Sequence, residues 1–230
     1  MRLLINTSLT GIFILLSISV FSQEEQSEAI NKRDQDGERH GEWKKYYKDS
    51  DQLRYEGTFE HGQEVGTFKF YAEDGGNQPE ATKTYKNKSD TAEAKFYSEE
   101  GSLITEGQLV DKKREGEWTY YHKSNPGQKM VTEHYESDKL NGQKNVYFSN
   151  GAITSKKYYK DGLKHGTKTV YSEDGDVRQK YTYRKDTLQG NSKVYDTEGK
   201  LLSEGKYKDG LRTGEWRFYS KGELDKVKNY

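Results

Sequence analysis

The side chains of this chain that could do chemistry are five histidines, 38 acidic residues and many hydroxyls. Zinc hydrolases typically carry two histidines one helical turn apart, and serine hydrolases need a sharp glycine-flanked elbow. Neither an H-E-x-x-H nor a G-x-S-x-G pattern occurs, and there is no cysteine. His40 and His165 each precede a glycine at equivalent positions of a repeat, so the architecture explains their placement. We therefore predict no catalytic residue, no metal ligand, no cofactor and no enzymatic activity.

The elements that must position these side chains follow a repeat. A glycine is followed five residues later by a tyrosine in most units, and one unit has Ala92 in place of the glycine. A second anchor, aromatic or leucine, precedes the glycine by seven residues from the second unit onward, as Phe59 and Tyr207 do. The eight tyrosines recur about every 24 residues, at Tyr46, Tyr71, Tyr97, Tyr121, Tyr147, Tyr171, Tyr195 and Tyr219.

Each unit is typical of a strand, a turn, a second strand and a loop. A period of about 24 residues fits two short strands, whereas a pair of helices with its loops needs about 33 or more. Glycines such as Gly151 and Gly175 follow Asn or Asp, which is typical of tight hairpin turns. We therefore predict an all-β fold over residues 37–230, an elongated single-layer antiparallel sheet of about eight β-hairpin repeats.

The composition agrees with a thin, folded protein. Only 30% of residues are apolar and 33% are charged, yet the chain holds 19 Tyr, 8 Phe and 3 Trp. Disordered chains are poor in aromatic residues, whose rings bury a large area each. The 38 basic and 38 acidic residues are interleaved and give no net charge. This balance excludes the basic footprint that nucleic-acid or anionic membrane binding requires.

The first 22 residues differ from the rest. Arg2, the apolar stretch 9–20 and the small residue Ser22 follow the order of a secretory signal peptide, which predicts cleavage after Ser22. A membrane anchor is the alternative, but the apolar stretch is short and interrupted by polar residues. We predict residues 1–22 as a signal peptide and residues 23–36 as a polar flexible leader. The protein would then be exported to the periplasm, the outer-envelope surface or the medium, with no stable membrane span.

Residues 55–71, YEGTFEHGQEVGTFKFY, resemble MORN repeats. That family's unit places a tyrosine, a glycine, an aromatic residue and two further glycines in order, here Tyr55, Gly57, Phe59, Gly62 and Gly66. The period and the Gly-Glu-Trp-x-x-Tyr core are most similar to the bacterial MORN variant of proteins labelled YwqK-family antitoxins. The resemblance covers residues 37–230 and implies that the motif residues are structural.

Large aromatic side chains on an open sheet face are typical of peptide- and sugar-binding surfaces. Core filling, or capping of the two ends of the array, is the alternative explanation for the tryptophans. Lys144, Lys168 and Ser192 stand where other units have an aromatic residue, so the middle of the array is less aromatic. The candidate partner-binding residues are Trp43, Phe68, Trp118, Tyr120, Trp216 and Phe218.

These features predict an exported, non-catalytic β-repeat scaffold for protein–protein interaction. The first alternative is a cell-envelope module that binds glycan or peptidoglycan, although such repeats carry Trp-Tyr pairs in nearly every unit. The label of the resembling family adds a periplasmic immunity or antitoxin protein. The expected partner is a protein or an envelope component, not nucleic acid. We expect mostly monomers that associate weakly through the C-terminal edge, where Lys226 and Lys228 discourage strand pairing.

Overall fold

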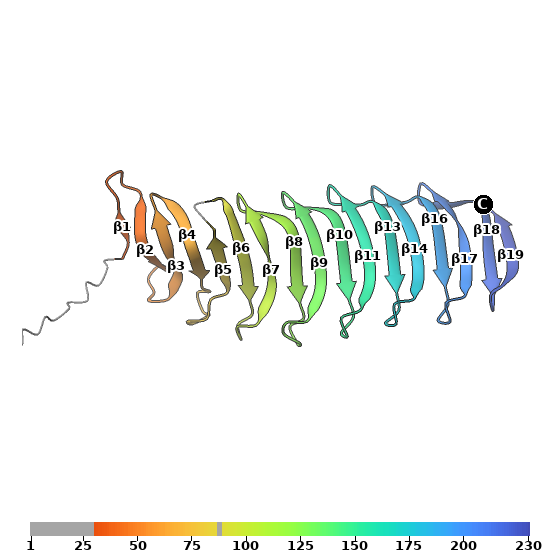
Figure 1. Cartoon of the computed structure of the whole chain (residues 1–230), viewed down its shortest axis with the longest axis horizontal. Coiled ribbons are helices and arrows are strands. Elements are labelled where there is room, and N and C mark those ends of the chain that lie inside the picture. The colour runs from red at the N-terminus through yellow and green to blue at the C-terminus, as the bar shows by residue number, and fades with distance from the viewer. Residues whose placement is uncertain (1–29, 87–88) are drawn as a thin grey trace, which may run out of the picture.

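The computed structural model describes residues 30–86 and 89–230, and in this part of the chain it contains strands and no helix. The strands form one open antiparallel sheet in which successive repeat strands pair in chain order (Figure 1). The predicted all-β, single-layer array of hairpins is therefore confirmed. The predicted signal peptide, residues 1–22, lies outside the described residues. In the described part, no helix has the length and apolarity that a membrane crossing requires.

In residues 30–86 and 89–230 the sheet has 19 strands. They are β1 (Lys32–Arg33), β2 (Arg39–Tyr46), β3 (Leu53–Glu60), β4 (Gln63–Phe70), β5 (Ala81–Tyr85), β6 (Thr91–Tyr97), β7 (Leu103–Val110), β8 (Lys113–Tyr121), β9 (Lys129–Glu136), β10 (Lys139–Tyr147), β11 (Ile153–Lys160), β12 (Leu163–Lys164), β13 (Gly166–Tyr171), β14 (Val177–Arg184), β15 (Thr187–Leu188), β16 (Gly190–Tyr195), β17 (Leu201–Lys208), β18 (Leu211–Ser220) and β19 (Glu223–Asn229). β12 and β13 are two parts of one repeat strand, as are β15 and β16.

The repeated glycine marks a β-bulge. Gly66 has a φ of 65°, which residues with a side chain seldom adopt. The β3–β4 register shifts at this point, so that Gly57 alone faces residues 66–68. Extra residues in one strand kink it and increase its twist. Ala92 replaces the glycine in β6, and there the β5–β6 register runs without a shift.

The predicted hairpin turns are present. Gly151 and Gly175 have φ angles of 86° and 90°. Their N–H groups donate to the carbonyls of Phe148 and Ser172, each at 3.0 Å, which closes the turns. The Asn-Gly and Asp-Gly pairs therefore supply the left-handed conformation that these hairpins need.

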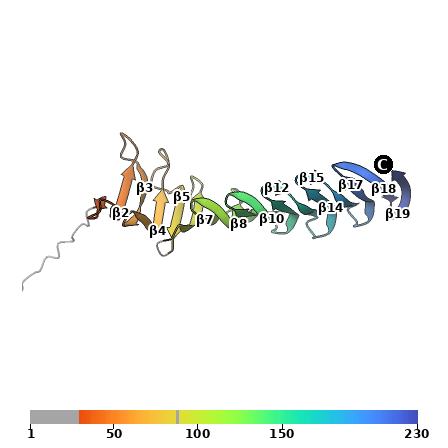
Figure 2. The ribbon, with the colours of Figure 1, turned by 90° about the horizontal axis from the view of Figure 1, so that it is seen from above.

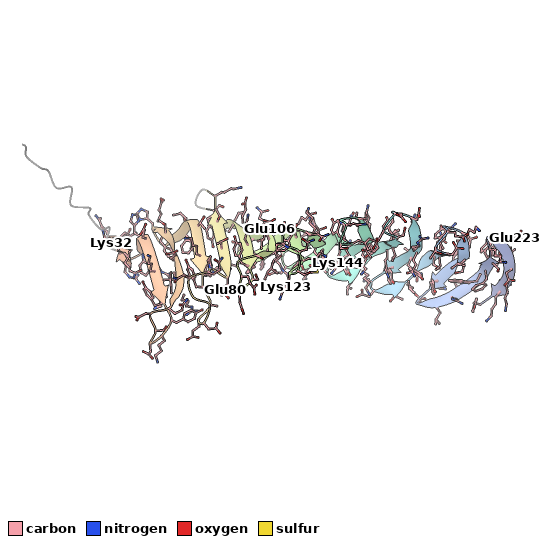
Figure 3. All side chains as sticks on the ribbon, turned by 90° about the horizontal axis from the view of Figure 1, so that it is seen from below. Lys32, Glu80, Glu106, Lys123, Lys144 and Glu223 are labelled. Carbon is pink, nitrogen blue, oxygen red and sulfur yellow. The ribbon has the colours of Figure 1, made fainter. Side chains whose placement is uncertain are left out.

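The two faces of the sheet carry different side chains. We call the face that holds Trp43, Phe68, Trp118 and Trp216 the aromatic face, and the opposite one the tyrosine face. Side chains project from both faces, and within the described residues no second layer covers either face (Figure 3). The sheet also twists along its length, so the strands of its two ends differ in direction (Figure 2).

The core lies on the aromatic face. Ala94, Leu109, Trp118 and Tyr135 form a buried cluster that spans strands β6 to β9. Because the sheet is a single layer, the neighbouring side chains of the same face must cover these residues. The result is a shallow core that extends along the ribbon rather than one central core, as in other repeat arrays.

The repeated tyrosines form a hydrogen-bonded ladder on the tyrosine face. The hydroxyl of Tyr121 donates to Glu106 at 2.5 Å, and that of Tyr219 donates to Glu204 at 2.9 Å. In each pair the acceptor is the residue fifteen positions earlier. Tyr71 follows the same rule with Glu56. Burial, and then this hydrogen bond, raises the pKa of Tyr71 to about 12. These tyrosines therefore have a structural role.

The described part of the expected leader, residues 30–36, takes part in the sheet. Lys32–Arg33 form β1 and pair with β2. The N–H of Asn31 donates to the carbonyl of Glu42 at 2.8 Å, and the indole of Trp43 donates to the carbonyl of Lys32 at 3.0 Å. The expectation of a flexible leader is therefore wrong for Lys32–Arg33, because backbone pairing with an open edge strand needs no apolar pattern.

Candidate partner-binding surface

A central row of side chains crosses the aromatic face, with one residue from each repeat strand. Its positions follow from the strand registers, in which Cα partners lie directly opposite each other. Across the bulges they follow from the close approach of Gly57, Gly107 and Gly205 to the aromatic ring on the next strand. The row consists of Trp43, Gly57, Phe68, Lys83, Ala94, Gly107, Trp118, Glu133, Lys144, Lys157, Lys168, Tyr181, Ser192, Gly205, Trp216 and Lys228.

Three large aromatic residues of this row are buried over glycines. A Cβ atom on Gly107 would lie 2.4 Å from the Trp118 ring, and one on Gly205 would lie 2.3 Å from the Trp216 ring. Phe68 covers Gly57 in the same way, at 2.5 Å. The Trp118 indole also donates to the carbonyl of Gln108 at 3.1 Å. Each of these aromatic rings therefore packs directly on the backbone of a glycine in the preceding strand.

This packing decides the role of the six predicted aromatic residues. Phe68, Trp118 and Trp216 are 1–3% exposed, so they stabilise the sheet. Trp43, Tyr120 and Phe218 are half-buried.

The six residues do not come together in one site. Phe218 stacks on Trp216 near the C-terminal end, with ring centroids 6.2 Å apart. Trp43 lies at the opposite end of the sheet, where its ring packs against Phe59 at 5.8 Å. Tyr120 lies between them and contacts the hydroxyl of Tyr135 at 3.3 Å.

The middle of the central row is basic. We call Lys144, Lys157 and Lys168 the lysine row. Lys144 lies directly opposite Lys157, and the β11–β13 register places Lys157 beside Lys168. All three residues are half-buried, and Lys144 lies near the middle of the ribbon (Figure 3).

One end of the lysine row is neutralised. The Lys144 ammonium donates to Glu133 at 2.5 Å, and the hydroxyl of Tyr135 donates to the other oxygen of the same carboxylate at 2.5 Å. Burial of Glu133 opposes its ionisation, but the hydrogen bonds from Lys144 and Tyr135 outweigh burial and lower its pKa. Glu133 is therefore a carboxylate at neutral pH and compensates Lys144.

The other two lysines have no such partner. Within residues 30–86 and 89–230, no ion pair joins Lys157 or Lys168 to a carboxylate. Burial, followed by the charges of Lys168 and Lys144, lowers the pKa of Lys157. The Lys168 ammonium lies 5.9 Å from the centre of the Tyr181 ring. The sheet therefore presents an uncompensated positive strip flanked by a tyrosine.

Sequence reasoning found only part of this strip. It marked Lys144 and Lys168 as interruptions of an aromatic pattern and overlooked Lys157. Lys157 lies on the second strand of its unit, and only the register between strands shows that it joins the other two. Reading one position across both strands of each unit would have found it.

One group of potential metal ligands occurs in the described residues. Asp34, His40 and His61 bring their ligand atoms within 4.8 Å of one another. They come from the β1–β2 loop, from β2 and from the β3–β4 turn. No sequence pattern signalled the group, because its members are on separate hairpins and Asp34 fell in the expected leader.

Comparison with known families supports the repeat assignment. A family model described as a MORN repeat variant matches residues 164–185 and 188–209. The matched segments run from β12 through β14 and from β15 through β17, and so each contains one unit of the array. No curated protein matches the chain. The chain thus carries two repeats of the MORN variant, at residues 164–209, within an all-β sheet.

Proposed function

We propose that this protein is an exported, non-catalytic β-repeat scaffold that binds an acidic segment of a protein partner on its aromatic face. The lysine row is the observation that carries the proposal. Three lysines on adjacent strands face the same side, and only Lys144 has a carboxylate beside it. Like charges placed next to each other on a sheet destabilise it. A loss of folding stability of this kind is typical of a functional site.

The surroundings of the row suit an acidic peptide. The side chains of Tyr159, Tyr181 and Tyr183 are half-buried on the same face. Half-buried tyrosines offer apolar contact area with a hydroxyl at the rim, as in many protein-binding surfaces. Carboxylates of a partner would neutralise Lys157 and Lys168, which favours both the encounter and its register.

Glycan or peptidoglycan binding is less well supported. Sugar-binding repeats use exposed aromatic rings, but Trp118 and Trp216 are buried against glycines. Of the three tryptophans, only Trp43 keeps part of its ring accessible, and Arg33 and Arg39 lie over that ring. A periplasmic immunity or antitoxin role, which the resemblance to YwqK-family proteins suggests, is a special case of the same protein-binding proposal.

Charge reversal on one face tests the proposal. Lys168→Glu should lower recovery of the partner from an envelope fraction by about tenfold, equivalent to about 1.4 kcal/mol. Lys180→Glu is the matched control, because Lys180 lies opposite Thr169 and projects from the tyrosine face. Both variants change the net charge equally, so the control should retain wild-type recovery by quantitative mass spectrometry. Equal losses in the two variants, or recovery of glycan instead of protein, would contradict the proposal.

The C-terminal edge strand of the sheet, β19, bears on the assembly state. β19 is the last strand, all of its residues are exposed, and it carries Lys226 and Lys228. We expect a monomer that associates weakly through this edge, because charged side chains oppose edge pairing. Lys226→Val with Lys228→Val should increase the mass measured by light scattering. An unchanged mass in this double variant would show that β19 is not the associating edge.

A further inference from the structure

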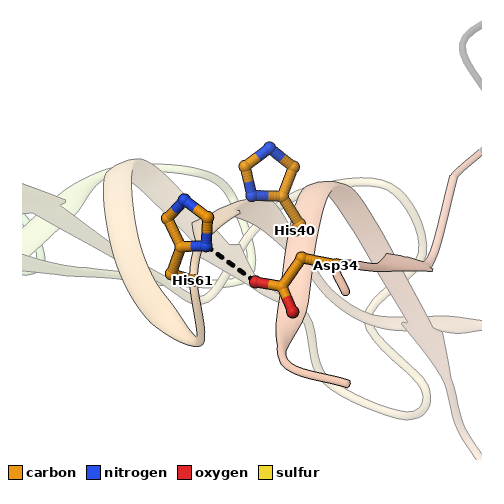
Figure 4. A group of neighbouring side chains, drawn as sticks. All are labelled: Asp34, His40 and His61. Carbon is orange, nitrogen blue, oxygen red and sulfur yellow. Dashed lines mark hydrogen bonds and ion pairs between the residues drawn. The ribbon is translucent and has the colours of Figure 1, made fainter. Parts of the chain in front are cut away.

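Three side chains with metal-binding atoms converge at the N-terminal end of the sheet. Nδ1 of His61 lies 2.8 Å from Oδ2 of Asp34, and the rings of His40 and His61 are 5.0 Å apart between centroids (Figure 4). All three ligand atoms lie within 4.8 Å of one another. Asp34, His40 and His61 belong to three different segments, so the fold and not local sequence brings them together.

Backbone contacts hold two of the three in place. Oδ1 of Asp34 accepts the N–H groups of Asp36 and Glu38 at 3.0 and 2.9 Å, which leaves Oδ2 toward His61. His61 has a φ of 47°, and the next residue, Gly62, donates its N–H to the carbonyl of Arg39 at 2.9 Å. The β3–β4 turn is thus tied to the strand that carries His40.

Positive side chains near the group are engaged elsewhere. Arg33 donates to the carbonyl of Gly37 at 2.5 Å. Arg39 lies 4.7 Å from the centre of the Phe59 ring, on the aromatic face. The carboxylate of Glu38 lies against Gly62, beside His61, and adds negative charge. The surroundings therefore favour a cation.

Two imidazole nitrogens and one carboxylate oxygen are a common ligand set for zinc. Tetrahedral zinc with bonds of about 2.1 Å requires ligand atoms about 3.4 Å apart. The present spacing needs only a small closure, and the side chain of His61 is 67% exposed and free to make it. The fourth position would be open to water or to Glu38. Hard cations such as Ca²⁺ and Mg²⁺ prefer oxygen ligands alone.

We propose that Asp34, His40 and His61 form a binding site for a divalent transition-metal ion, with Zn²⁺ as the best fit. The ion would link the β1–β2 loop to the β3–β4 turn. It would thereby fasten β1, a strand of only two residues, to the body of the sheet. The site lies at the N-terminal end and is independent of the lysine row, so this proposal does not rest on the partner-binding role.

Zinc titration by calorimetry tests the site, with purified, EDTA-treated protein that carries no polyhistidine tag. Wild type should bind one zinc ion per chain. His40→Ala and His61→Asn should each weaken binding by about a hundredfold, since even loss of an outer-shell partner costs about 10–100-fold. Asn at position 61 tolerates the left-handed backbone, which keeps the turn intact.

His165→Ala is the matched control. His165 also precedes a repeat glycine, but it is absent from the ligand group. This variant should bind zinc as wild type does. Zinc should also raise the thermal midpoint of wild type and of His165→Ala, and leave that of His61→Asn unchanged. Absence of zinc binding in wild type, or wild-type affinity in His40→Ala or His61→Asn, would overturn the proposal.

Discussion

Replacing Gly107 with alanine is expected to destabilise the sheet by about 2–3 kcal/mol, near the upper end for overpacking of a well-packed core. The added Cβ would lie 2.4 Å from the Trp118 ring, which is 3% exposed and has little room to move. Trp118 also belongs to the buried cluster with Ala94, Leu109 and Tyr135, so its displacement would disturb strands β6 to β9. Denaturant unfolding followed by tryptophan fluorescence measures the loss.

A double-mutant cycle separates this clash from a general effect of the substitution. Trp118→Ser alone should cost about 3–5 kcal/mol, as for other buried aromatic residues. In the Trp118→Ser background, Gly107→Ala should cost almost nothing, because the ring that it meets is gone. With both substitutions, a small side chain at position 118 would follow a residue with a Cβ atom eleven positions earlier. The chain already has this combination where Ser192 follows Tyr181 by eleven positions. Additive losses would show that Gly107 serves the backbone and not the ring.

Lys144→Met should destabilise the protein by about 2–3 kcal/mol at pH 7. Breaking a fully buried ion pair costs about 3–5 kcal/mol, and the lower figure allows for solvent at Lys144, whose side chain is 24% exposed. Glu133 would remain as a buried carboxylate, with the hydroxyls of Tyr135 and Tyr120 left to stabilise its charge. The free energy of unfolding at pH 7 is the measurement.

The stability difference between Lys144→Met and wild type should also change with pH in a defined direction. In wild type the pKa of Glu133 is lowered, so its contribution is present above the unfolded value of 4.5 and is lost as the pH falls through the folded pKa. In Lys144→Met, burial is opposed only by the hydroxyls of Tyr135 and Tyr120 and should raise that pKa. Protonation on acidification would then relieve the penalty. The stability difference between variant and wild type should therefore shrink as the pH falls from 7 toward 4.

Lys157→Met is the internal control for this experiment. Burial and the charges of Lys168 and Lys144 lower the pKa of Lys157, so its charged form costs stability at neutral pH. Removing that charge should leave stability unchanged or increase it. A loss in Lys157→Met equal to that in Lys144→Met would mean that the two side chains stabilise by packing alone, and that the Glu133 ion pair contributes little.

The repeat architecture could be predicted because each of its signals is local. A glycine or an Asn-Gly pair determines the backbone conformation of its own turn. Because the period is fixed, the same turn can be predicted at the corresponding position of every unit. The structure adds the reason for the repeated glycine, which is a bulge at positive φ. It also explains why the chain tolerates Ala92, since the β5–β6 register has no bulge at that point.

Features that depend on contacts between units could not be predicted in the same way. Predicting that Trp118 is buried would require knowing that its ring packs over Gly107, eleven residues earlier. Predicting the lysine row would require the registers that join β10, β11 and β13. The pairing of β1 rests on backbone hydrogen bonds, which leave no side-chain pattern in residues 30–36.

Site-specific photo-cross-linking tests the proposed binding face most directly. A photoreactive phenylalanine analogue at Tyr181, which faces Lys168, would sample the aromatic face, and the same analogue at Tyr171 would sample the tyrosine face near Lys156. Both positions hold a half-buried tyrosine, so the two probes are matched in size and exposure. After irradiation in the native envelope, we expect a protein adduct from position 181 that Lys168→Glu abolishes, and none from position 171. An adduct from position 171 alone, or equal adducts from both positions, would contradict binding at the lysine row.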